Sequence, residues 1–214
     1  MKTVMSSFSF FLPAPDLNRK RMPRPNKILP ILLICLLAPA GCPMESQEPV
    51  GETPASINPQ EWEGTWVSNN KEVDTRVLQS FNPTQGILIM KIKKWNEKKK
   101  QEETETSWLY LRQSGNWLFA SWREVGTSTF FWGGRIENLA MKDGGRVIVF
   151  WLPDFEKIPR LIARGELPGR LVEGKAGNQM LGPLLPKHYQ VMRDNEQEIF
   201  FRSEPFVLVR PAKQ

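Results

Sequence analysis

The chain has 214 residues, with 29 Lys and Arg, 23 Asp and Glu and a formal net charge of +6. Six of the basic residues and one acidic residue precede Cys42, which leaves 23 basic and 22 acidic residues from there on. This nearly neutral remainder carries no electrostatic footprint for nucleic acid, so we expect no nucleic-acid partner. Beyond Cys35 and Cys42 there is no Cys, which excludes an intramolecular disulfide, a thiolate nucleophile and a Cys-based metal site in the rest of the chain.

Residues 1–41 have the pattern of a removable secretory signal. The apolar run Ile28–Ala40 is shorter than the roughly 20 residues that a membrane-spanning helix needs, so we expect a cleaved leader rather than a membrane helix. Both Met1 and Met22 stay open as start sites, because a compact signal begins at Met22. The basic residues that lead the run are Arg19, Lys20, Arg21, Arg24 and Lys27.

The end of this run resembles the lipobox of bacterial lipoproteins, in which a small residue precedes an obligatory Cys. Ala40 and Gly41 match the two positions before Cys42, whereas Pro39 stands where the family usually has Leu. The resemblance implies cleavage before Cys42 and lipidation of its Sγ and freed amine, which anchors the protein in the membrane of the cell envelope. Pro43 rather than Asp follows the Cys. In enterobacteria-like systems this implies the outer membrane, facing the periplasm or the cell surface, rather than the inner membrane. The alternative is an ordinary signal peptide cut near Ala40.

The residues after Cys42 divide into a spacer and a domain. Residues 42–60 are rich in Pro, Glu, Ser and Gln, so we expect a lipidated N-terminus followed by a flexible tether. Residues 61–210 have about the usual size of one domain, and we expect them to form it.

Period-2 patterns dominate from Trp62 to about Leu152. On one expected strand Trp117 and Phe119 share a face, opposed by Leu118, Ala120 and Trp122. Turn-like breaks at 82–86, 114–116 and 143–145 separate the strands. Strands in direct succession predict a mainly β fold, an antiparallel meander that closes into a barrel or sandwich. Other runs of this kind are Val73, Thr75, Val77 and Phe81 against Asp74, Arg76 and Ser80; Leu88, Met90 and Ile92; Trp108 and Tyr110; Phe130 and Trp132; and Val147, Val149 and Trp151.

The pattern changes in the C-terminal third. Phe155, Ile158, Leu161 and Ile162 have helical spacing, which predicts a short helix over 154–164 with Asp154 as N-cap and Gly165 as stop. We expect a second short helix over 184–193, led by Pro186. The closing strands are expected at Ile199–Arg202 and Phe206–Arg210.

The segment Glu63-Gly64-Thr65-Trp66 resembles the first-strand Gly-x-Trp motif of lipocalins and the wider calycin group. The resemblance implies a lipocalin-like barrel in which Trp66 plugs one end. It also implies a basic residue, Arg210 or Arg202, packed over the indole. Residues 62–210 further resemble an uncharacterised group of bacterial envelope proteins, through Trp62 to Trp66, Gly165 to Gly169 and Pro205 to Arg210. That group supplies no activity.

All eight Trp residues lie between Trp62 and Trp151. A Trp-rich barrel suits an apolar ligand, but Trp also serves as bulk in a core. We expect Trp95 and Trp122 to face outward by alternation with their neighbours, toward a partner. The aromatic residues that we expect to line a ligand cavity or to fill the core are Trp108, Trp117, Trp132 and Trp151.

The sequence offers no recognisable catalytic constellation. His188 is the only His, and there is no Gly-x-Ser-x-Gly, phosphate loop or dinucleotide motif. We therefore expect no enzyme activity, no metal site and no cofactor. Carboxylate-only chemistry stays open, with Glu137 between Ile136 and Leu139 as the one acid in an apolar setting.

These patterns favour a non-catalytic role in the envelope. The first hypothesis is a carrier of an apolar small molecule, or a factor in envelope assembly or support, with the membrane and possible envelope proteins as partners. The alternative is a protein-interaction module whose filled barrel holds no ligand. The size of the barrel interior separates the two: an open interior supports the carrier and a packed interior supports the module.

Overall fold

The computed structural model describes residues 44–68, 75–96, 99–154, 156–171, 179–200 and 204–212. The leader, Cys42 and Arg202 lie outside the described residues, so the predictions made on them stay predictions. Among the described residues, no helix combines the length and apolar character needed to cross a membrane.

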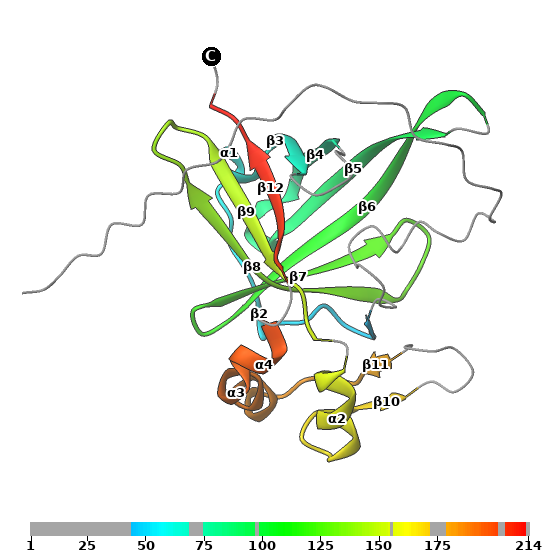
Figure 1. The fold of residues 1–214 in the computed structure, drawn as a ribbon, viewed down its shortest axis with the longest axis vertical. Coiled ribbons are helices and arrows are strands. Elements are labelled where there is room, and N and C mark those ends of the chain that lie inside the picture. Colours follow the sequence, from blue (N-terminus) through cyan, green and yellow to red (C-terminus); the bar gives the residue numbers. More distant parts are fainter. Residues whose placement is uncertain are drawn as a thin grey trace, which may run out of the picture. The chain divides into compact units, whose positions relative to one another are not determined.

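Eight antiparallel strands close into a barrel (Figure 1). Each strand pairs with the next along the chain, and the last one, β12, lies between β9 and β3 and closes the ring. The predicted mainly β meander with a lipocalin-like barrel is therefore confirmed. The barrel strands are β3 (Gly64–Ser68), β4 (Thr75–Asn82), β5 (Ile87–Asn96), β6 (Gln101–Ser114), β7 (Trp117–Glu124), β8 (Phe130–Ala140), β9 (Arg146–Trp151) and β12 (Phe206–Arg210).

The barrel interior is a hydrophobic core built from alternate residues of these strands. Because strand side chains alternate between faces, Leu88 and Met90 on β5 point inward together with Leu109 and Leu111 on β6. Its buried members are Ala55, Ile57, Trp62, Trp66, Leu78, Leu88, Met90, Leu109, Leu111, Ala120, Trp122, Phe131, Ile136, Ile148, Phe150, Leu152, Phe206 and Leu208.

The expected turns fall between the observed strands. Asn82 precedes a short 3-10 turn, η2 (Pro83–Gln85), and Gly86 follows it with a positive φ of 63°. Residues 115–116 separate β6 from β7, and residues 141–145 separate β8 from β9. Lys99 and Lys100 are exposed in the turn between β5 and β6.

An insertion of helices and short strands separates β9 from β12. It comprises α2 (Lys157–Ala163), β10 (Gly169–Leu171), β11 (Gln179–Leu181), α3 (Pro186–Asp194) and α4 (Glu196–Phe200). The two predicted helices are present, and Pro186 leads the second. The strand predicted at Ile199–Arg202 is wrong: Ile199 and Phe200 end helix α4, which begins with good helix formers and carries Glu196 and Glu198 in its first turn.

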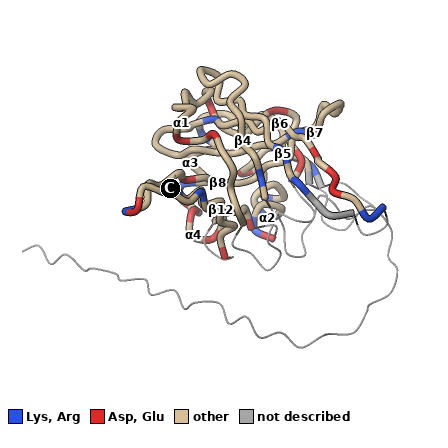
Figure 2. Tube along the Cα trace, turned by 90° about the horizontal axis from the view of Figure 1, so that it is seen from above, with Lys and Arg blue, Asp and Glu red and all other residues tan. Residues whose placement is uncertain are grey.

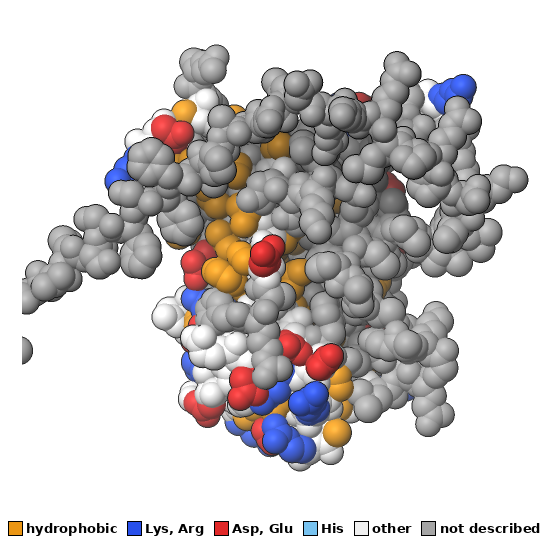
Figure 3. All heavy atoms as spheres, in the orientation of Figure 1, with side chains coloured by type: hydrophobic (Ala, Val, Ile, Leu, Met, Phe, Trp, Pro, Cys, Tyr) orange, Lys and Arg blue, Asp and Glu red, His pale blue; other side chains and the backbone are white. Residues whose placement is uncertain are grey.

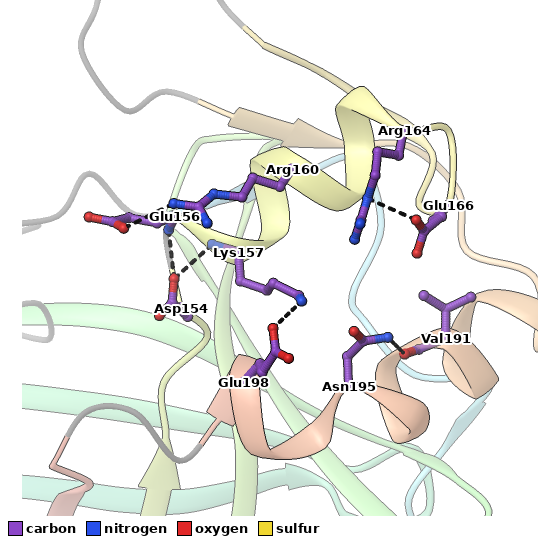
Figure 4. Close-up of polar contacts among 9 residues, drawn as sticks. All are labelled: Asp154, Glu156, Lys157, Arg160, Arg164, Glu166, Val191, Asn195 and Glu198. Atoms are coloured by element: carbon purple, nitrogen blue, oxygen red, sulfur yellow. Dashed lines mark hydrogen bonds and ion pairs between the residues drawn. The ribbon is translucent and has the colours of Figure 1, made fainter.

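Polar contacts hold the insertion helices together (Figure 4). The N-cap residue of α2 is Glu156 and not Asp154 as predicted. The Asp154 carboxylate nevertheless accepts hydrogen bonds from the backbone N–H groups of Glu156 and Lys157 at 2.8 and 2.7 Å, so it still satisfies donors at the start of α2. Lys157 of α2 pairs with Glu198 of α4. The sequence thus fixes the start of α2 locally, while an ion pair across 41 residues joins it to α4.

A second hydrophobic core lies between the insertion and the outer face of β7 and β8, and we call it the outer core. Phe200 of α4 packs edge-on against Trp117 and Trp132, with ring centroids 5.7 and 5.8 Å apart. In Figure 1 the insertion helices lie together below the barrel. The buried members of the outer core are Met44, Val50, Trp117, Phe119, Trp132, Ile158, Leu161, Ile162, Leu167, Leu181, Tyr189, Met192, Ile199 and Phe200.

The N-terminal segment 44–62 is part of the fold. Its short strand β1 (Glu45–Ser46) pairs with β8 and β11, β2 (Thr53–Pro54) pairs with β6, and α1 (Pro59–Trp62) precedes β3. The flexible tether predicted over 42–60 is therefore wrong for residues 44–60. The prediction rested on the Pro- and Glu-rich composition of this segment. It overlooked four widely spaced apolar residues that are each buried in one of the two cores. These are Met44, Val50, Ala55 and Ile57.

Candidate functional site

Trp66 lies at the end of the barrel where β3 begins. Its side chain is fully buried, and its indole Nε1 donates a hydrogen bond to the carbonyl of Trp62 at 2.9 Å. Helix α1 therefore packs next to the indole, and the side chain of its N-cap Asn58 accepts the backbone N–H of Gln60. This end of the barrel, which we call the plugged pole, is built by α1 and the first strand together.

Arg210 of the last strand covers the same indole. Its guanidinium carbon lies 5.0 Å from the centre of the Trp66 ring, and it donates hydrogen bonds to the carbonyls of Glu63 and Gln60. A cation over an indole contributes about 0.5–2 kcal/mol. Gly64 makes room for this arrangement: it has a φ of 130°, and a Cβ there would lie 3.0 Å from Arg210 Cδ. The Gly-x-Trp spacing thus has a steric cause in this chain.

A cleft of about 300 Å³ lies beside the plugged pole, between the N-terminal segment and the β6–β7 turn. Its lining mixes apolar and polar groups, and the indoles of Trp62 and Trp117 are only 4 and 5 % exposed. These two Trp residues therefore offer a ligand little exposed surface. The lining residues are Ala55, Ser56, Ile57, Asn58, Glu61, Trp62, Gln113, Gly115, Asn116, Trp117 and Leu118.

The structure places the candidate ligand-lining aromatics outside the barrel. Trp117 and Trp132 belong to the outer core, and Trp151 packs against it. Trp108 is half-buried and makes an edge contact with Phe81 at 4.6 Å. None of these four side chains belongs to the interior cluster of described residues. They are packing residues of the outer face and do not line a ligand cavity inside the barrel.

Trp122 lies inside the barrel, although the sequence predicted that it faces outward. It is 8 % exposed, belongs to the barrel interior and stacks against Phe131 with centroids 5.9 Å apart. Both faces of β7 are buried, so the alternation showed which residues share a face but not which face points into the barrel. The side chain of Trp95 lies outside the described residues.

Arg76 is a buried cation that the sequence did not single out. It lies opposite Trp66 on β4, is 1 % exposed, and its guanidinium carbon lies 4.4 Å from the centre of the Phe206 ring. The alternation on β4 put Arg76 on the polar face, but Arg76 and Leu78 share the face that turns inward. Burying a charged group costs free energy unless the surrounding groups compensate it. Arg76 therefore restricts which side chains can surround it in the barrel interior.

His188 has a structural position in helix α3. It is 8 % exposed, and its Nδ1 accepts the backbone N–H of Leu185 at 2.8 Å, which requires the neutral ring. Burial, and then the charge of Lys187, lowers the pKa of His188 from its usual 6.5. The imidazole therefore helps to start α3, and the nitrogen that would act as a base is already used.

Glu137 does not lie in an apolar setting. Its carboxylate pairs with Arg135 at 2.8 Å, and Arg135 also pairs with Glu196 and lies over the Trp117 ring at 5.1 Å. This ion pair removes the reason to single out Glu137 as a candidate catalytic acid. Within the described part of the chain, no three His, Cys, Asp or Glu side chains gather as a metal site would require.

Charges of both signs are interspersed over the described surface. Figure 2 shows acidic and basic positions along β5, β6 and their hairpin, where Lys93 pairs with Glu102 at 3.0 Å and Lys99 with Glu103 at 2.7 Å. On the face in Figure 3, red and blue side chains mix over the insertion. The described surface therefore has the mixed-sign pattern that the nearly neutral composition from Cys42 onward suggested.

The outer face of β4 and β6 carries aromatic side chains. Phe81 is 60 % exposed beside Trp108. Further along, Arg123 donates a hydrogen bond to the hydroxyl of Tyr110 at 2.8 Å and lies over the Phe130 ring at 5.1 Å. We call Phe81 and Trp108 the exposed aromatic pair.

No protein-family model matches the chain, and neither does any curated protein or solved structure. The resemblances to the lipobox and to the bacterial envelope group therefore stay predictions from the sequence.

Proposed function

We propose that the protein is a lipid-anchored component of the cell envelope and that its barrel is a non-catalytic protein-interaction module. The packing of the barrel interior is the observation that supports the proposed interaction module. Trp66, Leu88, Leu111, Ile148 and Leu208 come from different parts of the ring, and each is 0 % exposed. A void large enough for water would give its lining exposed surface, so these side chains border no such void. Ligand pockets have about 300–1,000 Å³ lined by exposed side-chain surface, which these positions do not offer.

The anchor rests on the sequence. The basic leader, the short apolar run and Ala40-Gly41-Cys42 support cleavage and lipidation at Cys42. Pro43 favours the outer membrane, facing the periplasm or the cell surface. Cys42→Ser is expected to leave an uncleaved or soluble form; a Cys42→Ser protein that is cleaved and still partitions into detergent would contradict the anchor.

The exposed aromatic pair is the surface that we assign to partner contact. Large aromatic side chains dominate interface energetics, and Phe81 is 60 % exposed. The mixed charges around the barrel favour no single charged partner. The proposed partner is another envelope protein.

The cleft beside the plugged pole favours a second candidate function, the binding of a small amphipathic molecule. Its volume of about 300 Å³ is at the lower end for ligand sites. Its side-chain amides from Asn58, Gln113 and Asn116 both donate and accept hydrogen bonds. This lining suits a polar molecule with a small apolar part better than a purely apolar one.

Complementation of a gene deletion tests the proposal through matched variants. The interior exchange Leu109→Met keeps the volume and is expected to complement, because the interior serves only packing. The surface exchange Phe81→Ser is expected to fail although the protein folds, because it removes the contact ring. His188→Ala and Glu137→Gln are expected to complement if folding is preserved, since neither does chemistry.

The opposite pattern would overturn the module. If Leu109→Met fails while folding normally and Phe81→Ser complements, the interior itself performs the function. If a folded His188→Ala or Glu137→Gln protein fails, an active site must replace the interaction surface. Circular dichroism and thermal unfolding of each purified variant establish folding in both cases.

A further inference from the structure

The fold begins almost directly after the proposed anchor. Met44 is fully buried in the outer core, and its carbonyl accepts the backbone N–H of Trp132 at 2.9 Å. The next two residues pair with β8 on one side and β11 on the other. The chain is thus fixed to the fold from Met44 onward and has no freedom to extend.

Only Pro43 separates Met44 from Cys42. Two residues of chain span at most about 7 Å, even when fully extended. A lipidated Cys42 has its acyl chains in the bilayer, so its backbone lies at the headgroup level. Met44 must then lie within about 7 Å of the headgroups.

The residues around β1 form one local surface. A small cavity of about 30 Å³ is lined from both sides of it, by Ser46, Glu48 and Pro49 at the end of β1 and by Leu181, Gly182 and Pro183 at the end of β11. Gln47, Glu48 and Pro183 are exposed. We call β1, residues 47–49 and residues 181–183 the β1 face.

We propose that the β1 face rests on the lipid bilayer surface, so that the domain lies directly on the membrane and cannot reach away from it. This inference depends on the proposed lipid anchor. The cavity lining on this face holds the acidic Glu48 and no basic residue, so the lipid and not charge attraction holds the face down. A partner of the module must accordingly be at the membrane surface as well.

Single-cysteine reporters on the purified lipoprotein in vesicles test this placement. Apart from the acylated Cys42, the chain after the leader has no Cys, so an introduced thiol is labelled alone. One reporter is Gln47→Cys on the β1 face. The other is Lys142→Cys, which is exposed beyond the far end of β8, about 30 Å along that strand from Trp132. The vesicles are phosphatidylcholine with a quencher attached to the headgroup.

The expected result is strong quenching of the Gln47→Cys label and weaker quenching of the Lys142→Cys label. Neither value should change when salt is raised, because charge does not hold the face. A matched variant carries a flexible 20-residue Gly-Ser insertion between Pro43 and Met44, which reaches about 25 Å on average. We expect this insertion to abolish the difference between the two labels.

Equal quenching of the two labels without the insertion, or a difference that survives it, would overturn the inference. Mass spectrometry of the same sample separates this from failure of the proposed anchor. Equal quenching with a lipidated Cys42 would contradict only the placement of the β1 face on the bilayer. A Cys42 without lipid would contradict the proposed lipid anchor, and with it the placement of the β1 face on the bilayer.

Discussion

The barrel interior and the outer core use similar side chains but recruit them differently. The interior takes alternate residues from eight strands, seven of which follow one another along the chain between Gly64 and Trp151. The outer core takes Trp117 and Phe119 from β7 and combines them with Met44, far upstream, and Phe200, far downstream. The interior is assembled mainly by neighbours in the chain, whereas the outer core is assembled by segments distant from one another.

The N-terminal segment connects the two. Met44 and Val50 lie in the outer core, while Ala55 and Ile57 lie in the barrel interior. Between them, Gly51 donates to the Tyr189 hydroxyl at 2.8 Å and approaches Arg112 so closely that a Cβ would lie 2.3 Å from Arg112 Cβ. The segment is therefore fastened at both ends, and we expect the two cores to unfold together.

Mutations that open a large cavity in either core should have the largest effect. Trp66→Ala in the interior and Trp132→Ala in the outer core should each lower the unfolding free energy by about 3–5 kcal/mol, because both indoles are nearly fully buried. Urea unfolding followed by circular dichroism measures this. A loss below about 1 kcal/mol for Trp66→Ala would show that it is not the plug.

A smaller but decisive effect is expected at the start of the fold. Met44→Ala should destabilise by about 2–5 kcal/mol, the range for buried Met, since Met44 is 0 % exposed. The exchange Gln47→Ala, at an exposed position of the same segment, is the control and should change stability by no more than about 0.5 kcal/mol. If the two variants are equally stable, residues 44–50 behave as a tether after all.

These first effects separate what the sequence could predict from what it could not. Period 2 along β5, β6 and β9, the turns between strands, the helical spacing of α2 and Pro186 at the start of α3 are local signals, and each predicted its element. The outer core depends on contacts across many residues, which no local pattern encodes. One signal was present: β7 is apolar on both faces, which is typical of a strand covered on both sides. It predicts an outer layer, although not that 44–50 and α4 supply it.

Replacing Arg210, which covers the plugged pole, should lower the unfolding free energy by a smaller amount. Arg210→Lys keeps the charge but loses the planar guanidinium that spans the carbonyls of Gln60 and Glu63, so we expect a loss of about 1 kcal/mol. Arg164→Lys, on an exposed side chain of the insertion, should be nearly neutral and serves as control. Equal stability of both variants would mean that the contact over Trp66 contributes nothing.

The pH dependence should reveal the smallest difference. The pKa of His188 is lower in the folded protein than the usual 6.5, so the unfolded chain binds more protons between these two values. His188 therefore contributes stability above pH 6.5 that is lost as the pH falls toward the folded pKa. Chemical denaturation across this range should show that loss in the wild type and a smaller one in His188→Gln. An identical pH profile in both proteins would contradict the assigned role.

The central claim is that the barrel interior is packed and empty of ligand. Native mass spectrometry of the purified lipoprotein, followed by the same measurement after unfolding, tests it most directly. The account predicts one mass, that of the processed chain with its acyl groups at Cys42, and no further molecule released on unfolding. A small apolar molecule that co-purifies in equal amount and is released on unfolding would contradict it and restore the ligand carrier.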